Sequence, residues 1–529
     1  MKLFQQLLVA PAALGLLAPV AQAADLNIAG VSDYAAAEQV TSVTQFSDVY
    51  PTDWAYQALS NLVEQYGCVA GYPNGTFRGN RAMTRYEAAA LLNACLDRIT
   101  EVTDELRRLI KEFETELAVL RGRVDGLEAR VGELEATQFS TTTKLKGKAS
   151  FVLGAVHAKG DNPRNARDHY DATQGALNFS YDLRLGLATS FTGKDLLFTR
   201  LRSGNFDNVF KGQGVNLTTL DVASNTDNHV KVDRLYYRFP LGSNFTVVAG
   251  PLVRNTEMMG YKPTAYARGA ATQLAFFGGF LGTPAVWSKT TGAGFGAIYR
   301  SNHAKGDAHW TVAANYVAEN GNLSNPNAGG IMTDNANGAF TSQLAYGSKQ
   351  WGLAAGYRYS QCDTSFKSGT SFAAVNSWNQ NCNSVIGDGF RSEAEAHSWS
   401  VNGFWTPEES GWVPSISAGY SKAYLDGNFA YNNAEKLASW MVGLQWSDVL
   451  LDGNDLGFAV GQPQFVSALD KGQPDDGNYA MELWYQFQVT DNIAVTPGVF
   501  WLSRPMGDLT PEDKSVGVFG GVVQTVFKF

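Results

Sequence analysis

The sequence is short of cysteine and, after its first residues, of long apolar runs. Four cysteines in 529 residues are too few to form the main framework of the fold. After residue 23 there is no run of about eighteen apolar residues, the length that a membrane-spanning helix needs. The chain is therefore predicted to be neither a disulfide-framed protein nor a helical membrane protein.

Basic charge and histidine are sparse in ways that exclude other classes. The net charge is −9: residues 1–143 hold 11 Lys and Arg against 18 Asp and Glu, and residues 144–529 hold 30 against 32. Neither part has the basic excess of a nucleic-acid-binding protein, so no nucleic-acid partner is expected. The six histidines are scattered without metal-ligand spacing, and neither a Gly-x-Ser-x-Gly elbow nor a phosphate-binding loop occurs. We therefore expect no enzyme, no metal and no cofactor.

What is present begins with an export signal over residues 1–23. Lys2 gives a positive start, Leu7 to Leu17 form an apolar core, and Ala21-Gln22-Ala23 is a small-x-small cleavage site. A buried helix is the alternative, but the segment is too short to span a membrane and ends in the cleavage pattern. The mature chain is expected to begin with a linker over 24–45 and to leave the cytoplasm, where disulfides can form.

Residues 46–99 have the pattern of a small helical module. Leu59, Leu62 and Val63 recur at helical spacing after an aspartate that can cap the helix. A Pro/Asn/Gly turn follows at 71–77, and a Thr-x-x-Glu capping box at 84–87 starts a second helix. Cys68 and Cys95 flank the turn and this second helix. They can form a disulfide or remain two buried thiols.

The motifs of this module resemble those of the S-layer homology domain. They are Phe-Ser-Asp-Val at 46–49, Trp-Ala at 54–55, Gly-Tyr-Pro-Asn-Gly-Thr-Phe at 71–77 and Thr-Arg-Tyr-Glu at 84–87. That family binds cell-wall polysaccharide, often pyruvylated, so the resemblance implies that Arg85 meets an acidic sugar group. It also implies a groove lined by four further residues: Trp54, Gly71, Tyr72 and Gly75. A buried core anchor is the alternative role for the tryptophan, because buried tryptophan is common.

A heptad seam follows the module. Nine apolar residues alternate at spacings of four and three, which predicts a coiled coil over 100–138. They are Leu106, Ile110, Phe113, Leu117, Leu120, Val124, Leu127, Val131 and Leu134. The flanking charges would pair attractively between parallel chains in register. A single amphipathic helix packed on its own domain is the alternative.

From residue 139 to 529 the apolar pattern has a period of two. Leu177, Phe179 and Tyr181 begin an apolar series that alternates with Asn178, Ser180, Asp182 and Arg184. Because one face suits lipid and the other carries charge, the pattern predicts transmembrane strands around a water-filled lumen. We count sixteen candidate strands, with long and short connections in alternation, as in outer-membrane barrels. Tryptophans near the segment ends suit an interfacial girdle: Trp287, Trp310, Trp351, Trp412, Trp484 and Trp501.

The predicted fold is thus a mainly β chain, with a 16-stranded antiparallel transmembrane β-barrel after the helical module and coiled coil. The C-terminal Phe529 on an alternating strand resembles the assembly signal of outer-membrane barrels. The whole arrangement resembles cyanobacterial-type outer-membrane porins, whose barrels are grouped with the carbohydrate-selective porins. The resemblance implies an outer-membrane homotrimer with its N-terminal domain in the periplasm.

Two functions follow from these predictions, and the sequence supports both. One is passive diffusion of small hydrophilic solutes and inorganic ions, with sugars or iron among them. The other is a structural tether between outer-membrane lipid and peptidoglycan-linked polysaccharide, with a nearly closed barrel. An outer-membrane lipase or protease would need a nucleophile–base constellation that the sequence lacks. Because the barrel is near neutral overall, we expect no strong field that selects cations or anions.

The longest connection, 253–290, is the candidate for a pore constriction. A sixteen-stranded barrel is wide enough for an aqueous channel, so something must narrow it. The first half of this connection carries both charge signs, on Arg254, Glu257, Lys262 and Arg268, and its second half is apolar. An outward surface loop is the alternative. In another long connection, Cys362 and Cys382 are predicted to form a disulfide.

Overall fold

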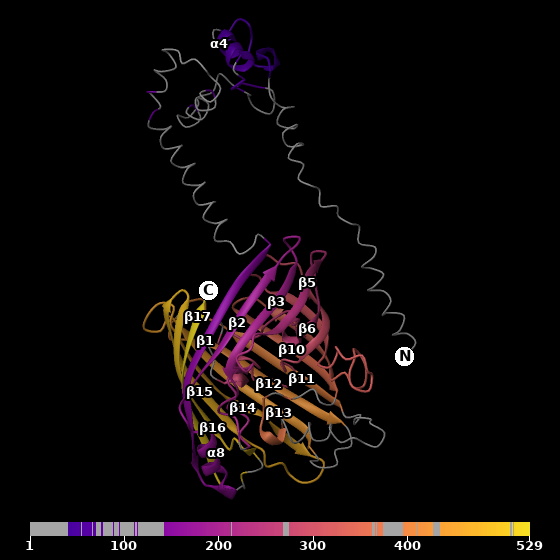
Figure 1. Cartoon of the computed structure of the whole chain (residues 1–529), viewed down its shortest axis with the longest axis vertical. Coiled ribbons are helices and arrows are strands. Elements are labelled where there is room, and N and C mark those ends of the chain that lie inside the picture. The colour runs from indigo at the N-terminus through magenta and orange to yellow at the C-terminus, as the bar shows by residue number, and fades with distance from the viewer. Residues whose placement is uncertain are drawn as a thin grey trace. The chain divides into compact units, whose positions relative to one another are not determined.

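The computed structural model describes residues 41–53, 56–65, 67–69, 76–77, 88, 95, 111, 114, 142–212, 214–267, 274–361, 366, 368–373, 395–409, 411–426, 434–507, 510 and 513–529 (Figure 1). The chain divides into two compact units, residues 1–138 and 139–529. The predicted export signal over 1–23 lies outside the described residues. So does the predicted coiled coil over 100–138, apart from Lys111 and Glu114, which are both helical.

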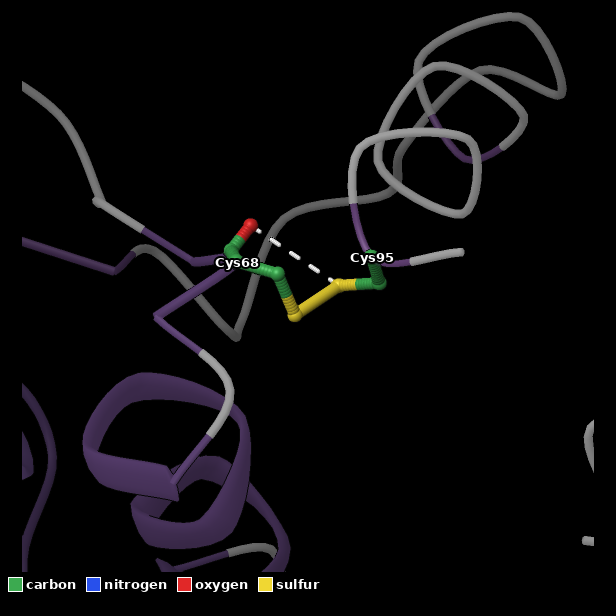
Figure 2. The surroundings of a disulfide bond; sticks show 2 residues. All are labelled: Cys68 and Cys95. Atoms are coloured by element: carbon green, nitrogen blue, oxygen red, sulfur yellow. Dashed lines mark hydrogen bonds between the residues drawn. A yellow bond between two sulfur atoms is a disulfide. The ribbon is translucent and has the colours of Figure 1, made fainter. Parts of the chain in front are cut away.

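The N-terminal unit has a small apolar core beneath three short helical segments. These are η1 (Val43–Gln45), α4 (Tyr56–Ser60) and the π-helical turn η2 (Asn61–Gln65). Ser42 begins η1 in a capping box with Gln45, and Leu59 and Val63 are buried, as the helical spacing predicts. In the structure Cys68 and Cys95 are joined by a disulfide, and Cys95 belongs to the same core (Figure 2).

The C-terminal unit is one closed antiparallel barrel, in which β1 pairs with both β2 and β17 (Figure 1). Its sixteen strands are β1 (Thr143–Gly160), β2 (Asn178–Thr189), β3 (Leu196–Phe206), β5 (Lys231–Leu241), β6 (Phe245–Arg254), β7 (Thr291–Arg300), β8 (His309–Ala318), β9 (Gly338–Gly347), β10 (Trp351–Gln361), β11 (Glu395–Trp405), β12 (Ser415–Asp426), β13 (Ala434–Ser447), β14 (Asp455–Leu469), β15 (Tyr479–Thr490), β16 (Ile493–Ser503) and β17 (Val516–Lys528). The two-residue strand β4 (Ser224–Asn225) pairs only with the end of β3. Every one of the sixteen predicted strands is confirmed.

Short helices occur only in the long connections of the described barrel. They are η3 (Pro163–Asn165), α8 (Ala166–Gln174), η4 (Asn255–Glu257) and α9 (Ala275–Gly278). Among the described residues, none of the helices has the length and apolar character to cross a membrane.

The two faces of the barrel wall differ as the alternation predicts. Large apolar side chains such as Phe179, Leu353 and Trp405 are exposed on the outer face. Four of the six girdle tryptophans are exposed, but the prediction is wrong for Trp287 and Trp484, which are 5% and 1% exposed. Trp287 belongs to the connection between β6 and β7, which folds into the barrel, and Trp484 on β15 is contacted by Tyr266 of that same connection.

Candidate functional site

The connection between β6 and β7 lies inside the barrel over its described residues, 255–267 and 274–290, which we call the inner loop. Near its start, the Asn255 amide donates to Thr341 Oγ1 on β9 at 3.5 Å. Tyr261 then donates its backbone N–H to Gln343 at 3.0 Å, and its hydroxyl to the backbone oxygen of Ser348 in the short turn after β9. The loop therefore runs along the inner face of the wall from one end of the barrel towards the other.

The inner loop then crosses to the opposite wall. The Ala265 N–H donates to Ser417 Oγ on β12 at 2.9 Å, and the Ala267 N–H donates to Gln445 on β13 at 2.7 Å. Glu482 on β15 accepts hydrogen bonds from the Tyr266 hydroxyl at 2.7 Å and from the Leu274 N–H at 2.9 Å. Because all these acceptors are buried side chains of different strands, the loop occupies the lumen and is not an outward surface loop.

On its way back the loop is held by polar side chains of β10, β11 and again β13. The Asn402 amide donates to the Leu281 carbonyl, and the Ser439 hydroxyl donates to the Gly282 carbonyl, both at 3.0 Å. The buried Arg358 donates to the Ala285 carbonyl at 3.3 Å. These bonds satisfy backbone groups that would otherwise be buried without partners, and such groups are costly to leave unpaired.

Two more connections fold inward and form an apolar plug with the inner loop. Residues 207–230, after β3, bury Phe210, Leu217 and Leu220 in one cluster with Phe276 and Phe277 of the inner loop. Each fully buried side chain of this kind contributes about 1.5–3 kcal/mol. Residues 366–373 join them, because the Asn216 amide donates to the Gly369 carbonyl at 3.0 Å and Ser371 donates to the Gly214 carbonyl at 2.7 Å.

The remaining part of the lumen is strongly basic. Strands β1 to β7 carry twelve Lys and Arg against two Asp, whereas β8 to β17 carry four against five Asp and Glu. We define the basic cluster as nine side chains on this side of the lumen. They are Lys148, Arg184, Arg200, Arg202, Arg234, Arg238, Arg254, Lys289 and Arg300. The near-neutral total of the barrel therefore hides a separation of charge between its two sides.

Two aspartates join the arginines of the cluster into a network. Asp182 lies 2.6 Å from both Arg184 Nε and Arg202 Nε. Asp233 lies 2.6 Å from Arg200 Nε and 3.7 Å from Arg202 Nη1. The arginine side chains remain 12–22% exposed, so water reaches them. The network therefore forms an ordered, partly exposed surface.

A β-bulge explains how Asp233 enters this network. The register between β3 and β5 shifts, so that Arg200 lies opposite Arg234 and Leu201 lies opposite Val232. Asp233 is the extra residue, and a bulge can turn such a residue towards the face it would otherwise avoid. As a result two neighbouring residues contribute to the network: Asp233 to Arg200, and Arg234 to Glu257 at 2.7 Å.

An ion pair connects the inner loop to the connection 207–230. Lys289 donates to Asp221 and also lies 4.5 Å from the centre of the Phe280 ring. Burial alone would raise the pKa of Asp221, but Lys289 outweighs it and holds that pKa well below the usual carboxyl range. Burial also lowers the pKa of Lys289. This ion pair holds two inward segments together beside the basic cluster.

The structure brings together part of the predicted constriction site. Arg254 lies at the end of β6, and the Glu257 carboxylate accepts from its backbone N–H at 3.2 Å as well as from Arg234. Lys262 is exposed, and Arg268 lies outside the described residues. The arginines of β2, β3 and β5 were not predicted as site residues, although the polar face of 177–188 was recognised. Counting charge on alternate residues of each predicted strand would have found them.

The other predicted sites lie outside the described residues. These are the wall-polymer residues Trp54, Gly71, Tyr72, Gly75 and Arg85, and the cysteines Cys362 and Cys382. One hydrogen bond connects the end of the 71–77 segment to the core of the module. The Asp48 carboxylate accepts it from the Phe77 N–H at 2.7 Å.

Comparisons with known proteins agree with this architecture. Residues 101–529 match the family described as "Carbohydrate-selective porin, OprB family", and residues 45–89 match the S-layer homology domain. The uncharacterized protein alr4550 of Nostoc sp. is 37% identical over 93% of this chain and 86% of its own length. The outer membrane protein SlpA of Deinococcus radiodurans is 29% identical over 38% of this chain and 19% of its own. Among solved structures, Pseudomonas putida OprB at high pH is similar with a TM-score of 0.49 and 14% identity, over 75% of this chain and 96% of that one. The chain therefore belongs to the OprB family of carbohydrate-selective porins, which places it among the β-barrels of the outer membrane.

Proposed function

We propose that this porin lets small hydrophilic solutes and inorganic ions, with sugars and iron among the candidates, diffuse passively through a narrow path beside the basic cluster. The observation that carries the proposal is the closed barrel in which β1 to β7 carry partly exposed charged side chains. The apolar plug leaves less room than a barrel of this strand number would otherwise provide. A narrow polar path suits ions and small solutes better than large nutrients.

Conductance in planar lipid bilayers tests this proposal directly. The purified full-length protein should give discrete current steps in potassium chloride. The competing function is a structural tether with a nearly closed barrel, which predicts no steps above the lipid background from protein that is folded by circular dichroism. Mass measurement in detergent would test the accompanying proposal of a homotrimer, which a monomer or dimer would contradict.

We also propose that the N-terminal module binds a peptidoglycan-linked polysaccharide, so that one chain joins the outer membrane to the wall from the periplasmic side. The match to the S-layer homology domain supports this role, and the motif of that domain points to Arg85 as the residue that meets an acidic sugar. The full-length protein in detergent should co-sediment with peptidoglycan sacculi, and Arg85→Ala should weaken this binding. Arg98→Ala serves as a matched control, because Arg98 lies outside the matched residues 45–89. Equal sedimentation of the Arg85→Ala variant and the unmodified protein would contradict the role.

A further inference from the structure

The lumen carries a local excess of positive charge in a protein whose net charge is −9. The basic cluster has nine cationic side chains, and they are contacted by four carboxylates: Asp182, Asp221, Asp233 and Glu257. The excess is therefore five positive charges. The opposite wall does not add to it, because β8 to β17 are nearly balanced.

The carboxylates position the arginines rather than neutralise them. Asp182 is shared by two guanidinium groups, and Asp233 lies within 4 Å of three, those of Arg200, Arg202 and Arg234. Each shared carboxylate orients at least two cations while cancelling one charge, and the planar guanidinium keeps further N–H donors for a third partner. Arg234 Nη2 and Arg238 Nε are such donors, because both are buried and have no hydrogen-bond partner within the described part of the chain.

Other cations of the cluster face the inner loop without any carboxylate partner in the described ranges. Arg238 donates to the Glu257 carbonyl at 3.4 Å, and Arg300 donates to the Gly260 carbonyl at 3.0 Å. These contacts direct positive charge into the space between the wall and the loop. Lys148 on β1 lies directly opposite Arg184 on β2 in the strand register, which extends the basic surface along the wall.

From this arrangement we infer that the channel prefers anions and that the basic cluster forms its selectivity surface. The inference rests on the proposed channel function and names the solute class as small anions. Oxyanions such as phosphate should bind best, because a planar guanidinium group can donate two parallel hydrogen bonds to them. Walls of low dielectric concentrate the field of the fixed charges, so anions accumulate in the path and cations are repelled. Neutral solutes would pass only as far as size permits.

The test is the reversal potential of single channels in a tenfold gradient of potassium chloride. We expect its sign to show chloride selectivity, with a permeability ratio over potassium of at least about fivefold. Lys148→Glu combined with Arg300→Glu changes the cluster by four charge units and should bring the ratio to about one or below. Lys422→Glu combined with Lys436→Glu is a control with the same charge change outside the cluster, and it should leave the ratio unchanged.

The outcomes separate the two levels of the proposal. No current from folded protein would overturn the channel function itself. Current with a potassium-selective or unselective reversal potential would overturn the anion preference while leaving the channel in place. If the double variant fails to fold, inorganic phosphate provides a second measurement on the unmodified protein. Added at equal ionic strength, it should reduce the chloride current several-fold by occupying the arginines, and an unchanged current would count against the cluster as the selectivity surface.

Discussion

The contact between Tyr266 and β15 gives a sharp prediction about the inner loop. The Tyr266 hydroxyl donates to Glu482 and accepts from Trp484 Nε1, each at 2.7 Å, and all three residues are about 1% exposed. Tyr266→Phe removes one atom and keeps the ring in place. It deletes both hydrogen bonds, and the buried indole N–H loses its acceptor.

The expected cost follows from the two losses. A net hydrogen bond contributes about 1 kcal/mol, and leaving the indole donor unsatisfied costs about 1–3 kcal/mol more, so the loop contact should weaken by about 2–4 kcal/mol. At about 1.4 kcal/mol per factor of ten, the population with a released loop should rise roughly 30- to 700-fold. The barrel wall itself should keep its stability, because the strand pairing is untouched.

The assay combines single-channel noise with amide hydrogen exchange of the inner loop. Tyr266→Phe should increase current fluctuations and speed exchange at Ala267 and Leu274, whose N–H groups bond to the far wall. Tyr420→Phe, on the outer face, is the matched control and should change neither. Adding Trp484→Phe removes the stranded donor, so the double variant should be less affected than the sum of the single variants. Unchanged noise and exchange in a folded Tyr266→Phe protein would refute the reasoning.

Three further predictions concern the loops and the N-terminal module. Deleting Met258 to Arg268 should raise single-channel conductance, because this part of the inner loop crosses the lumen; an unchanged conductance would place the constriction elsewhere. The Asp221–Lys289 contact should not weaken as the pH falls towards about 4, because a carboxylate with a depressed pKa keeps its stabilising charge above its unfolded value near 3.9 and loses it only as pH falls through the folded pKa. As the pH rises, the contact should begin to weaken before the ordinary lysine pKa near 10.4 is reached, since burial lowers the pKa of Lys289. The current noise should depend on pH through this contact, and Asp221→Asn should abolish that dependence. Its persistence in the variant would exclude the pair as its source. Cys68→Ser should destabilise the module by about 3–4 kcal/mol, as expected for a disulfide that spans 27 residues, whereas an unchanged unfolding transition of the module would show that the bond contributes little.

The barrel could be predicted because its information is local. Each strand must present apolar residues to lipid and polar residues to the lumen, so a period of two in the sequence marks it directly, as in Leu177 to Leu187. The first helical segments of the module were predictable for the same reason, through the spacing of Leu59 and Val63. The inner loop was found by its length and composition. Its path was not, because contacts such as Ala267 with Gln445 join residues far apart in the chain.

The sequence by itself therefore determined the order of the parts, the sixteen strands and the chemistry of each wall face. Only the tertiary structure decided where charge accumulates. The pairing register of β2, β3 and β5 places their arginines side by side, and a bulge turns Asp233 towards them. Three connections fold inward and bury Trp484, which the sequence pattern had assigned to the lipid interface. The physical reason is that local periodicity specifies which face a residue occupies. The lumen of a barrel, in contrast, is formed by residues that meet only after the chain closes on itself.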